Sequence, residues 1–472
     1  MGLIDALASI SKSFPEVKKP NYAVSIQERI MWTVGALIIF FIMYNVTAFG
    51  VKQTTEMDFL QVITASKIGS LLTVGIGPIV LASIFLQLFK GAGLINLNMN
   101  SVEDRKKFHE VQKVLALMLA IIEATIFVST GKTMLINTET LTIALVIAQI
   151  TIGAMILFYL DETISKYGIG SGISLFIAAG VSLAILGGLS NLIFGQNGVT
   201  QTLVERGADA IPVALIVLLP FVFTMIVFFI CVYAEGMKVE IPVAYEAVRG
   251  IIPKLPLKFF YVSNIPVIFA SALLLNIQLF AAPLFIELTK QKWMYGDQNI
   301  VHYIGYVDEN NRVSDGFIYL ITPIYAYGGT QAHFNFVFNQ STPKFGIPEW
   351  VHAIVYLIFL IFICIIFGLF WAETGNMDAK SVADQLNQAG LQIPGYRRDP
   401  RLLEKVLGRY ISPLVIMSSA SVGLLAGLAD LTGALGTGTG ILLTVGILYK
   451  MYEEFEKLKV FDIYPQMSKI FT

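Results

Sequence analysis

Ten stretches of this sequence are apolar and long enough to cross a membrane as helices. A spanning helix needs about 20 mostly apolar residues. Of the 472 residues, 56% are apolar and only 14% are charged, whereas about a quarter are charged in a typical soluble domain. The sequence therefore predicts an all-α polytopic membrane protein with ten transmembrane helices at 30–50, 74–94, 111–130, 140–160, 171–190, 211–234, 259–285, 351–372, 410–429 and 434–452.

The second stretch contains a break. A short apolar piece, 57–65, is too brief to span a bilayer, and Gly75-Ile76-Gly77-Pro78 interrupts the apolar run that follows it. Lipid cannot pair exposed backbone groups, so irregular backbone at membrane depth has to be buried in protein or line a water-filled cavity. The break therefore predicts a pathway through the membrane.

The distribution of Lys and Arg predicts the orientation. Basic residues are enriched in the cytoplasmic loops of membrane proteins. When the loops are assigned to alternate sides, the side of the two termini carries 24 of the 32 Lys and Arg residues, and the other side carries 8. We therefore expect both termini in the cytoplasm, with cytosolic loops at 235–258 and 373–409 and the long loop 286–350 outside.

Ten spans divide naturally into two halves of five. The N-terminal half is 1–190, an external hinge loop follows at 191–210, and the C-terminal half is 211–472. An odd number of spans per half gives the halves opposite orientations, as in inverted repeats that hold a site between them. No residue-level similarity between the halves is evident, so the repeat is predicted from topology alone.

No group of residues indicates catalysis, a cofactor or a metal ion. The four His residues fall in or near predicted loops, and Cys231 and Cys364 lie inside apolar stretches. Neither a catalytic base inside a span nor a set of metal ligands is therefore expected, and no enzymatic activity. Secondary transporters share inverted repeats and broken helices, and they stay an alternative, although a coupled carrier normally shows more ionisable groups at mid-depth.

Two features inside the predicted spans have both a functional and a structural interpretation. Glu123 is an acidic residue well inside a span, where a carboxylate is costly, so it should face a cavity or a partner. Ile76 and Val80 share one helix face, and Ile173 and Ile177 repeat this spacing. Branched aliphatic side chains at a constriction exclude ions by dewetting, but ordinary helix packing gives the same spacing.

Four segments resemble signatures of the SecY / eukaryotic translocon alpha-subunit family. SLLTVGIGPIVLASIFLQLF (70–89) resembles the family's second span, and LDETISKYGIGSGISLFIAAG (160–180) resembles its second signature. Residues 257–276 and 433–445 resemble its seventh and tenth spans. The resemblance covers 26–454, and the loops are closer to the archaeal and eukaryotic branch than to the bacterial one.

The resemblance implies the central pore-forming subunit of a Sec protein-conducting channel. Such a channel translocates unfolded polypeptides and releases transmembrane segments laterally into lipid. It implies two halves around a central pore with an apolar ring at its waist, formed here by Ile76, Val80, Ile173, Ile177, Ile268 and Leu443. It also implies a plug helix at 57–66 on the outer side of the ring, which includes Met57, Phe59, Leu60, Val62, Ile63 and Ser66.

The resemblance further implies a lateral gate and docking loops. The gate would open between the helices 74–94 and 111–130 and the helices 259–285 and 351–372. Its polar residues would be Gln87, Glu123 and Asn276, whereas Leu81 replaces a Thr of some relatives and makes the gate more apolar. The cytosolic loops would dock ribosomes through Arg249, Lys258, Arg397 and Arg398, although positive-inside topology also explains these charges.

The resemblance also implies partners and a location. The expected partners are small single-span subunits of the SecE/gamma type and the beta type, the ribosome, signal sequences, nascent polypeptides and the lipid bilayer. The expected location is the cell (plasma) membrane, as a multi-pass protein with both termini cytoplasmic. No cofactor is implied.

Overall fold

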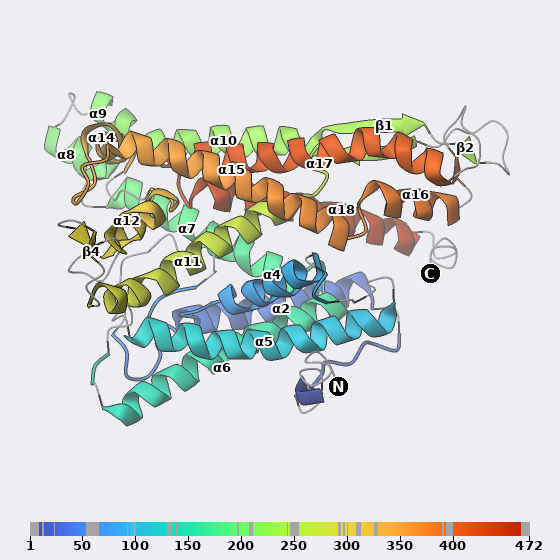
Figure 1. The fold of residues 1–472 in the computed structure, drawn as a ribbon, viewed down its shortest axis with the longest axis horizontal. Helices are drawn as coiled ribbons and strands as arrows, with labels where there is room; N and C mark the ends of the chain where they lie inside the picture. The colour runs from blue at the N-terminus through green and yellow to red at the C-terminus, as the bar shows by residue number, and fades with distance from the viewer. Residues whose placement is uncertain are drawn as a thin grey trace.

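The structure is a computed structural model in which long helices run approximately along the longest axis of the molecule (Figure 1). It describes residues 9–11, 14–22, 24–52, 66–91, 93–95, 97, 101–129, 135–137, 139–195, 198–206, 211–242, 244–245, 254–290, 294–295, 298–299, 301–307, 313–324, 329–388, 391–392 and 400–463.

Each predicted span corresponds to a described helix. Seven of the described helices are long and apolar enough to cross a membrane, and two shorter apolar ones lie within α4 and α11. The tenth, α18, has Lys450, Glu453 and Glu454 in its C-terminal half. The long helices are α2 (Ile26–Asn45), α4 (Gly77–Gly91), α5 (Val102–Ser129), α6 (Thr140–Tyr167), α7 (Gly172–Phe194), α10 (Leu219–Gly236), α11 (Ile265–Lys290), α15 (Glu349–Thr374), α17 (Pro400–Leu431) and α18 (Gly438–Ile463).

The predicted span 211–234 is not one continuous helix, which corrects that prediction. It consists of α9 (Ile211–Val217) and α10, with Leu218 between them. Pro220 lies in the first turn of α10. A proline ring lacks an N–H and clashes with the preceding helical turn, so it favours a new helix start at this point.

The connections form short elements at the two ends of the bundle. The strands β1, β2 and the helix α16 lie at one end in Figure 1, and α8, α12 and α14 lie at the other. The predicted cytosolic and external loops thus gather at opposite ends. These elements are α8 (Val199–Arg206), α12 (Val301–Ile304), α13 (Phe317–Leu320), α14 (Gly329–Asn339), α16 (Ala379–Gln388), β1 (Lys238–Pro242), β2 (Ala244–Tyr245), β3 (Lys254–Lys258), β4 (Met294–Tyr295), β5 (Gln298–Asn299), β6 (Tyr306–Val307), β7 (Val313–Asp315) and β8 (Leu391–Gln392).

In the part of the chain that the structure describes, the strands pair only in twos, and one pair joins two loops. β1 pairs antiparallel with β3, β4 with β5, and β6 with β7, each within one connection. By contrast, β2 pairs with β8, in the register Ala244↔Gln392 and Tyr245↔Leu391. This ladder joins the predicted cytosolic loops 235–258 and 373–409 through their backbones.

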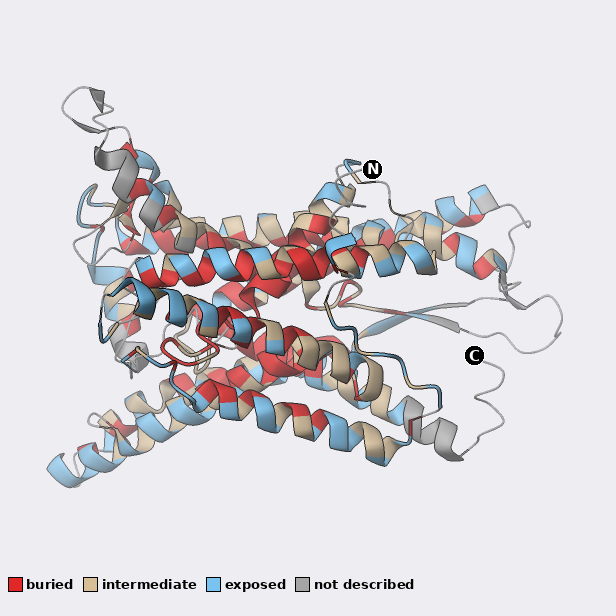
Figure 2. Cartoon of the chain, turned by 90° about the horizontal axis from the view of Figure 1, so that it is seen from below, coloured by how far each residue is buried: buried red, intermediate tan, exposed pale blue. Residues whose placement is uncertain are grey.

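The two predicted halves meet along several helices. α7 contacts α18, while α4 contacts α11 and α15. Buried residues gather along the middle of the bundle, and exposed residues occupy outward faces (Figure 2). The largest group of buried apolar side chains includes residues from both halves. The core therefore lies between the halves as well as within each of them.

The chain before α4 is irregular and buried, as predicted for the break. α4 begins at Gly77, and the preceding residues form turns. The Ser70 hydroxyl accepts a hydrogen bond from the Leu72 amide at 3.1 Å. The Thr73 hydroxyl accepts one from the Gly69 amide at 3.1 Å. Ser70, Leu72 and Thr73 are fully buried, so the polar side chains pair backbone groups that lipid would leave unpaired.

Neighbouring helices hold this turn in place. The Leu71 amide donates to the Val46 carbonyl at the end of α2 at 3.0 Å, and the Ala48 amide donates to the Gly69 carbonyl at 2.9 Å. On the other side, a Cβ at Gly153 in α6 would lie 2.1 Å from the Leu71 carbonyl oxygen. Glycine at this position therefore allows α6 to approach the turn closely.

We expect Gly153→Ala to destabilise the protein. The added methyl group overlaps the Leu71 carbonyl and forces the turn or α6 to shift, which typically costs about 1–3 kcal/mol. Thermal unfolding of the purified protein in nanodiscs should show a lower midpoint. The matched control is Gly187→Ala in α7, where the methyl group meets no atom within 4 Å. Equal midpoints for the two variants would contradict this interpretation.

Candidate functional site

The predicted apolar ring is the first part of the candidate site. Its residues come from α4 and the turn before it, α7, α11 and α18, and therefore from both halves. Ile76, Val80, Ile177 and Leu443 are buried within one apolar cluster, and the partly buried Ile173 and Ile268 pack against the same cluster. The structure thus brings all six predicted residues into one apolar core that crosses the boundary between the halves.

The predicted plug lies mostly outside the described residues. Met57, Phe59, Leu60, Val62 and Ile63 belong to this undescribed part. Ser66, the last predicted plug residue, is described and is 2% exposed. It immediately precedes the buried turn that leads into α4.

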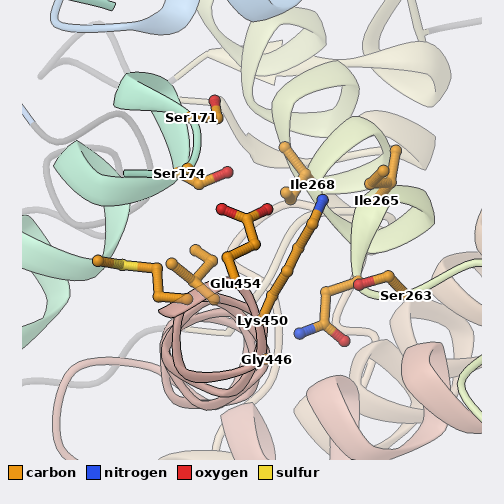
Figure 3. Close-up of a pocket in the computed structure, with 12 residues that line it drawn as sticks. Ser171, Ser174, Ser263, Ile265, Ile268, Gly446, Lys450 and Glu454 are labelled. Atoms are coloured by element: carbon orange, nitrogen blue, oxygen red, sulfur yellow. The ribbon is translucent and has the colours of Figure 1, made fainter. Parts of the chain in front are cut away.

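A small cavity with both polar and apolar lining residues lies beside the predicted ring. Its volume is about 70 Å³, and it is bounded by the starts of α7 and α11 and by the middle of α18. Figure 3 shows the side chains of Lys450 and Glu454 extending from α18 toward α7 and α11, with Ser171 and Ser174 on the opposite wall. The ring residue Ile268 is also part of the lining. The cavity is therefore in contact with one of the six predicted ring residues.

The four predicted gate helices contact one another. α4 contacts α5, α11 and α15, and α5 contacts α11. Glu123 and Asn276 are each 3% exposed, and Gln87 is half-buried. Among the described residues, the Glu123 Oε1 and Asn276 Oδ1 atoms have no hydrogen-bond partner. Leu81 is buried in the apolar cluster, so this region of contact is mainly apolar.

Lys258 is paired within the chain. Its Nζ atom lies 2.5 Å from the carboxylate of Glu453 in α18 and 5.2 Å from the ring centroid of Tyr449. The other three predicted docking residues, Arg249, Arg397 and Arg398, lie outside the described residues. Lys258 therefore links the end of β3 to α18.

A tyrosine that follows the loop 235–258 is hydrogen-bonded to the loop 373–409. Tyr261, just before α11, donates its hydroxyl hydrogen to the Met377 carbonyl at 2.8 Å. Burial, together with the nearby Asp378 charge, raises the pKa of Tyr261 to about 12, so the hydroxyl keeps its proton. The β2–β8 ladder joins segments that precede Arg249 and Arg397, whereas the Tyr261 bond joins a residue that follows Lys258 to the start of the loop 373–409.

Three acidic residues at helix ends were missed by the sequence analysis. Asp161, Glu235 and Asp430 each lie one residue beyond a predicted span, but the observed helices α6, α10 and α17 include them. Glu235 and Asp430 are buried. Glycine-rich segments after Asp161 and Asp430 were the available signal, because such segments allow close helix contact. Glu123 is therefore not the only acidic side chain buried in a helix of the bundle.

Among the described residues, no group of three or more His, Cys, Asp or Glu side chains is placed to hold a metal ion. Cys231 and Cys364 are both buried and free. The chemistry available at the ring is therefore that of apolar packing, with hydrogen-bonding groups at its edges.

Comparisons with known sequences agree with this geometry. A model of the SecY protein family matches residues 70–452. The protein translocase subunit SecY of Methanocaldococcus jannaschii is 40% identical over 466 residues, which cover 98% of this chain and 99% of the relative.

Solved structures with the same fold are also similar in sequence. "The structure of a protein conducting channel" has a TM-score of 0.80 at 40% identity, and a structure on the plug domain of SecY has 0.77 at 38%. Sec61 in the canine ribosome–channel complex has 0.77 at 40%. Each comparison covers 98% of this chain and 99% of the other. With a family match over most of its length and about 40% identity to a full-length relative, the chain belongs to the SecY family.

Proposed function

We propose that this chain is the central pore-forming subunit of a protein-conducting channel, which translocates unfolded polypeptides and releases transmembrane segments laterally into lipid. The observation that carries the proposal is the single apolar cluster that joins six aliphatic ring residues from both halves. Members of the SecY family are channel proteins and not enzymes, and the similar solved structures include a protein-conducting channel. Membership of this family removes the secondary-transporter alternative.

The ring explains how the resting channel stays sealed. Branched aliphatic side chains around a constriction make it unfavourable for water and ions to enter. A polypeptide in extended form can displace these side chains, because apolar packing is not directional. The plug at 57–66 adds a second closure on the outer side. A structure similar to this chain concerns the SecY plug and its membrane seal, which supports that role.

The gate is proposed to open between α4 and α5 on one side and α11 and α15 on the other. The contacts of α4 with α11 and α15 support a closed arrangement here. A signal sequence is an apolar helix, so it binds at the gate by replacing protein contacts with its own and shifts a closed–open equilibrium. A hydrophobic segment then partitions into lipid according to its hydrophobicity.

We also propose the orientation and the partners. Both termini are cytoplasmic in a cell membrane, in agreement with the bias of basic residues and with the gathering of the loops at two ends (Figure 1). A ribosome supplies the push at loops 235–258 and 373–409, as the canine Sec61 complex suggests. Small single-span subunits of the SecE/gamma and beta types complete the channel, and exposed apolar side chains on α10, such as Phe229, offer one packing surface.

Replacement of three ring residues with glycine should make the resting channel leak. We expect Ile76→Gly, Val80→Gly and Ile177→Gly together to raise resting ion conductance at least tenfold, because the constriction loses its apolar side chains. Planar bilayers containing the purified channel measure this directly. The matched control replaces the exposed Ile152, Leu186 and Ile358 with glycine. Wild-type conductance of the ring variant would refute the seal.

Charge reversal at two loop arginines should weaken ribosome binding. We expect Arg249→Glu with Arg397→Glu to lower affinity and to reduce the dependence on salt by about one unit of logarithmic slope per lost phosphate contact. Sedimentation of proteoliposomes with ribosomes at several salt concentrations gives both values. Lys106→Glu with Lys107→Glu is the control, since it makes the same charge change at the start of α5. If the control weakens ribosome binding equally, Arg249 and Arg397 contribute to the orientation of the protein in the membrane and not to ribosome docking.

Replacement of Glu123 should change the selectivity for signal sequences. Glu123→Leu removes a buried carboxylate whose Oε1 atom has no described partner, so the gate contact becomes more apolar and the closed state more stable. We expect weakly hydrophobic signal sequences to be transported severalfold less, while strong ones are transported normally. Translocation into proteoliposomes measures the ratio. Lower stability with an unchanged ratio would indicate a purely structural role.

A further inference from the structure

α7 and α18, the last spanning helix of each half, begin with a glycine packed against the preceding spanning helix. A Cβ at Gly172 would lie 2.5 Å from Asp161 Cα in α6. A Cβ at Gly438 would lie 2.2 Å from Ala429 Cβ and 2.4 Å from the Asp430 nitrogen in α17. In both halves, the fourth spanning helix (α6 or α17) is therefore in close contact with the first turn of the fifth (α7 or α18).

At both contacts, an aspartate pairs with the first amides of the helix. The Ile173 amide donates to Asp161 Oδ1 at 2.8 Å. The Gly438 amide donates to Asp430 Oδ1 at 2.7 Å, and the Thr439 amide approaches the same oxygen at 3.3 Å. A carboxylate is favourable there, because the first amides of a helix have no partner within the helix and carry partial positive charge.

A short sequence repeat coincides with this arrangement. Gly168–Leu175 and Gly436–Leu443 share the pattern Gly-x-Gly-[Ser/Thr]-Gly-Ile-x-Leu. The helix begins two positions earlier in the second copy: α7 begins at the fifth position of the pattern, Gly172, and α18 begins at the third, Gly438. The halves therefore do share residue-level similarity, which corrects the conclusion drawn from the sequence. Because the halves are inverted, the two caps lie toward opposite sides of the membrane.

Both capped helix starts carry ring residues. Ile173 supplies the amide that Asp161 binds, and Ile177 lies one turn further along α7. Leu443 lies in the second turn of α18, shortly after the amides that Asp430 binds. The first turns of a helix fray most readily when their amides lose a partner. The position of these ring residues therefore depends on the two aspartates.

Asp430 also contacts a gate helix. The Tyr356 hydroxyl of α15 donates to Asp430 Oδ2 at 2.9 Å, and Tyr356 is only 1% exposed. One carboxylate therefore binds the start of the ring helix α18 with one oxygen and the gate helix α15 with the other. A displacement of α15 changes the environment of the same group that holds α18.

We propose that Asp161 and Asp430 are paired positioning residues, which hold the ring-bearing starts of α7 and α18 in place from opposite sides of the membrane, and that Asp430 also connects the ring to α15 through Tyr356. The inference rests on the proposed function of the ring as a seal. Neither aspartate needs to touch the translocating polypeptide.

Resting ion conductance of the full-length channel in planar bilayers tests the proposal. We expect Asp161→Ala and Asp430→Ala each to raise conductance about tenfold, the shift that loss of one helix cap produces in an equilibrium. Asp161→Asn and Asp430→Asn should restore most of the seal, because the amide oxygen still accepts a hydrogen bond. Tyr356→Phe should raise conductance about threefold, because it breaks only the bond to α15.

Asp315→Ala is the matched control. Asp315 is fully buried and accepts hydrogen bonds from the Gly316, Lys344 and Phe345 amides in the long external loop, away from the ring. We expect its conductance to equal that of the wild type even if its melting temperature falls. Equal leakage from this control would overturn the proposal, because the effect would then follow from general loss of stability.

The ring variant with three glycines separates the two hypotheses. If it leaks while the Ala variants of Asp161 and Asp430 remain sealed, the positioning role is overturned and the proposed function stands. If the ring variant does not leak, the seal itself is refuted, and the inference falls with it. If the Ala variants do not fold, wild-type conductance of Tyr356→Phe overturns the link between Asp430 and α15.

Discussion

Backbone groups that are not paired within a helix have to find partners in the protein wherever they lie at membrane depth. The structure meets this requirement at three helix starts. The hydroxyl groups of Ser70 and Thr73 accept hydrogen bonds from backbone amides of the turn before α4. The carboxylates of Asp161 and Asp430 accept hydrogen bonds from amides at the starts of α7 and α18. No water is available in the lipid core to hydrogen-bond these backbone groups, so each irregular helix start has to be buried in the protein. Five of the six predicted ring residues lie within or next to these same starts, whereas Ile268 lies at the start of α11.

Close approach of helices follows from the same requirement. The side chains of Ser, Thr and Asp are short. They reach a backbone amide of a neighbouring segment only where the two backbones nearly touch. Gly153, Gly172 and Gly438 permit this contact, because a side chain there would overlap the turn before α4, helix α6 and helix α17, respectively. The apolar cluster extends across both halves. Apolar packing has no preferred direction, so the hydrogen bonds at the helix starts add the directional contacts that packing lacks.

The gate and the cytosolic loops show a similar division between apolar and polar contacts. α4 packs on α11 and α15 mainly through apolar side chains, and Glu123 adds a buried carboxylate whose Oε1 atom has no hydrogen-bond partner among the described residues. Such a contact can separate without breaking many hydrogen bonds. By contrast, the β2–β8 ladder joins the two predicted cytosolic loops, and the Tyr261–Met377 hydrogen bond joins the segment just before α11 to the second of these loops. The C-terminal half therefore presents both loops as one unit.

Much of the fold could be predicted because lipid imposes a strict rule on composition. Apolar length located all ten spans, and the Gly75–Pro78 break located the irregular start of α4. The aliphatic identity of the six ring residues was also visible, while their roles came from family resemblance. The prediction was wrong for the continuous span 211–234, since Pro220 begins a new helix after Leu218.

The sequence by itself determined that this chain spans a membrane, where its helices lie and that one of them is broken, because these properties depend on the local balance of apolar and charged residues. Only the tertiary structure decided which side chains pair the helix starts. Asp161 and Asp430 act on amides that belong to the next helix and lie across a turn. Apolar periodicity carries no information about such pairs, because hydrogen bonds between helices depend on how closely two backbones approach in space.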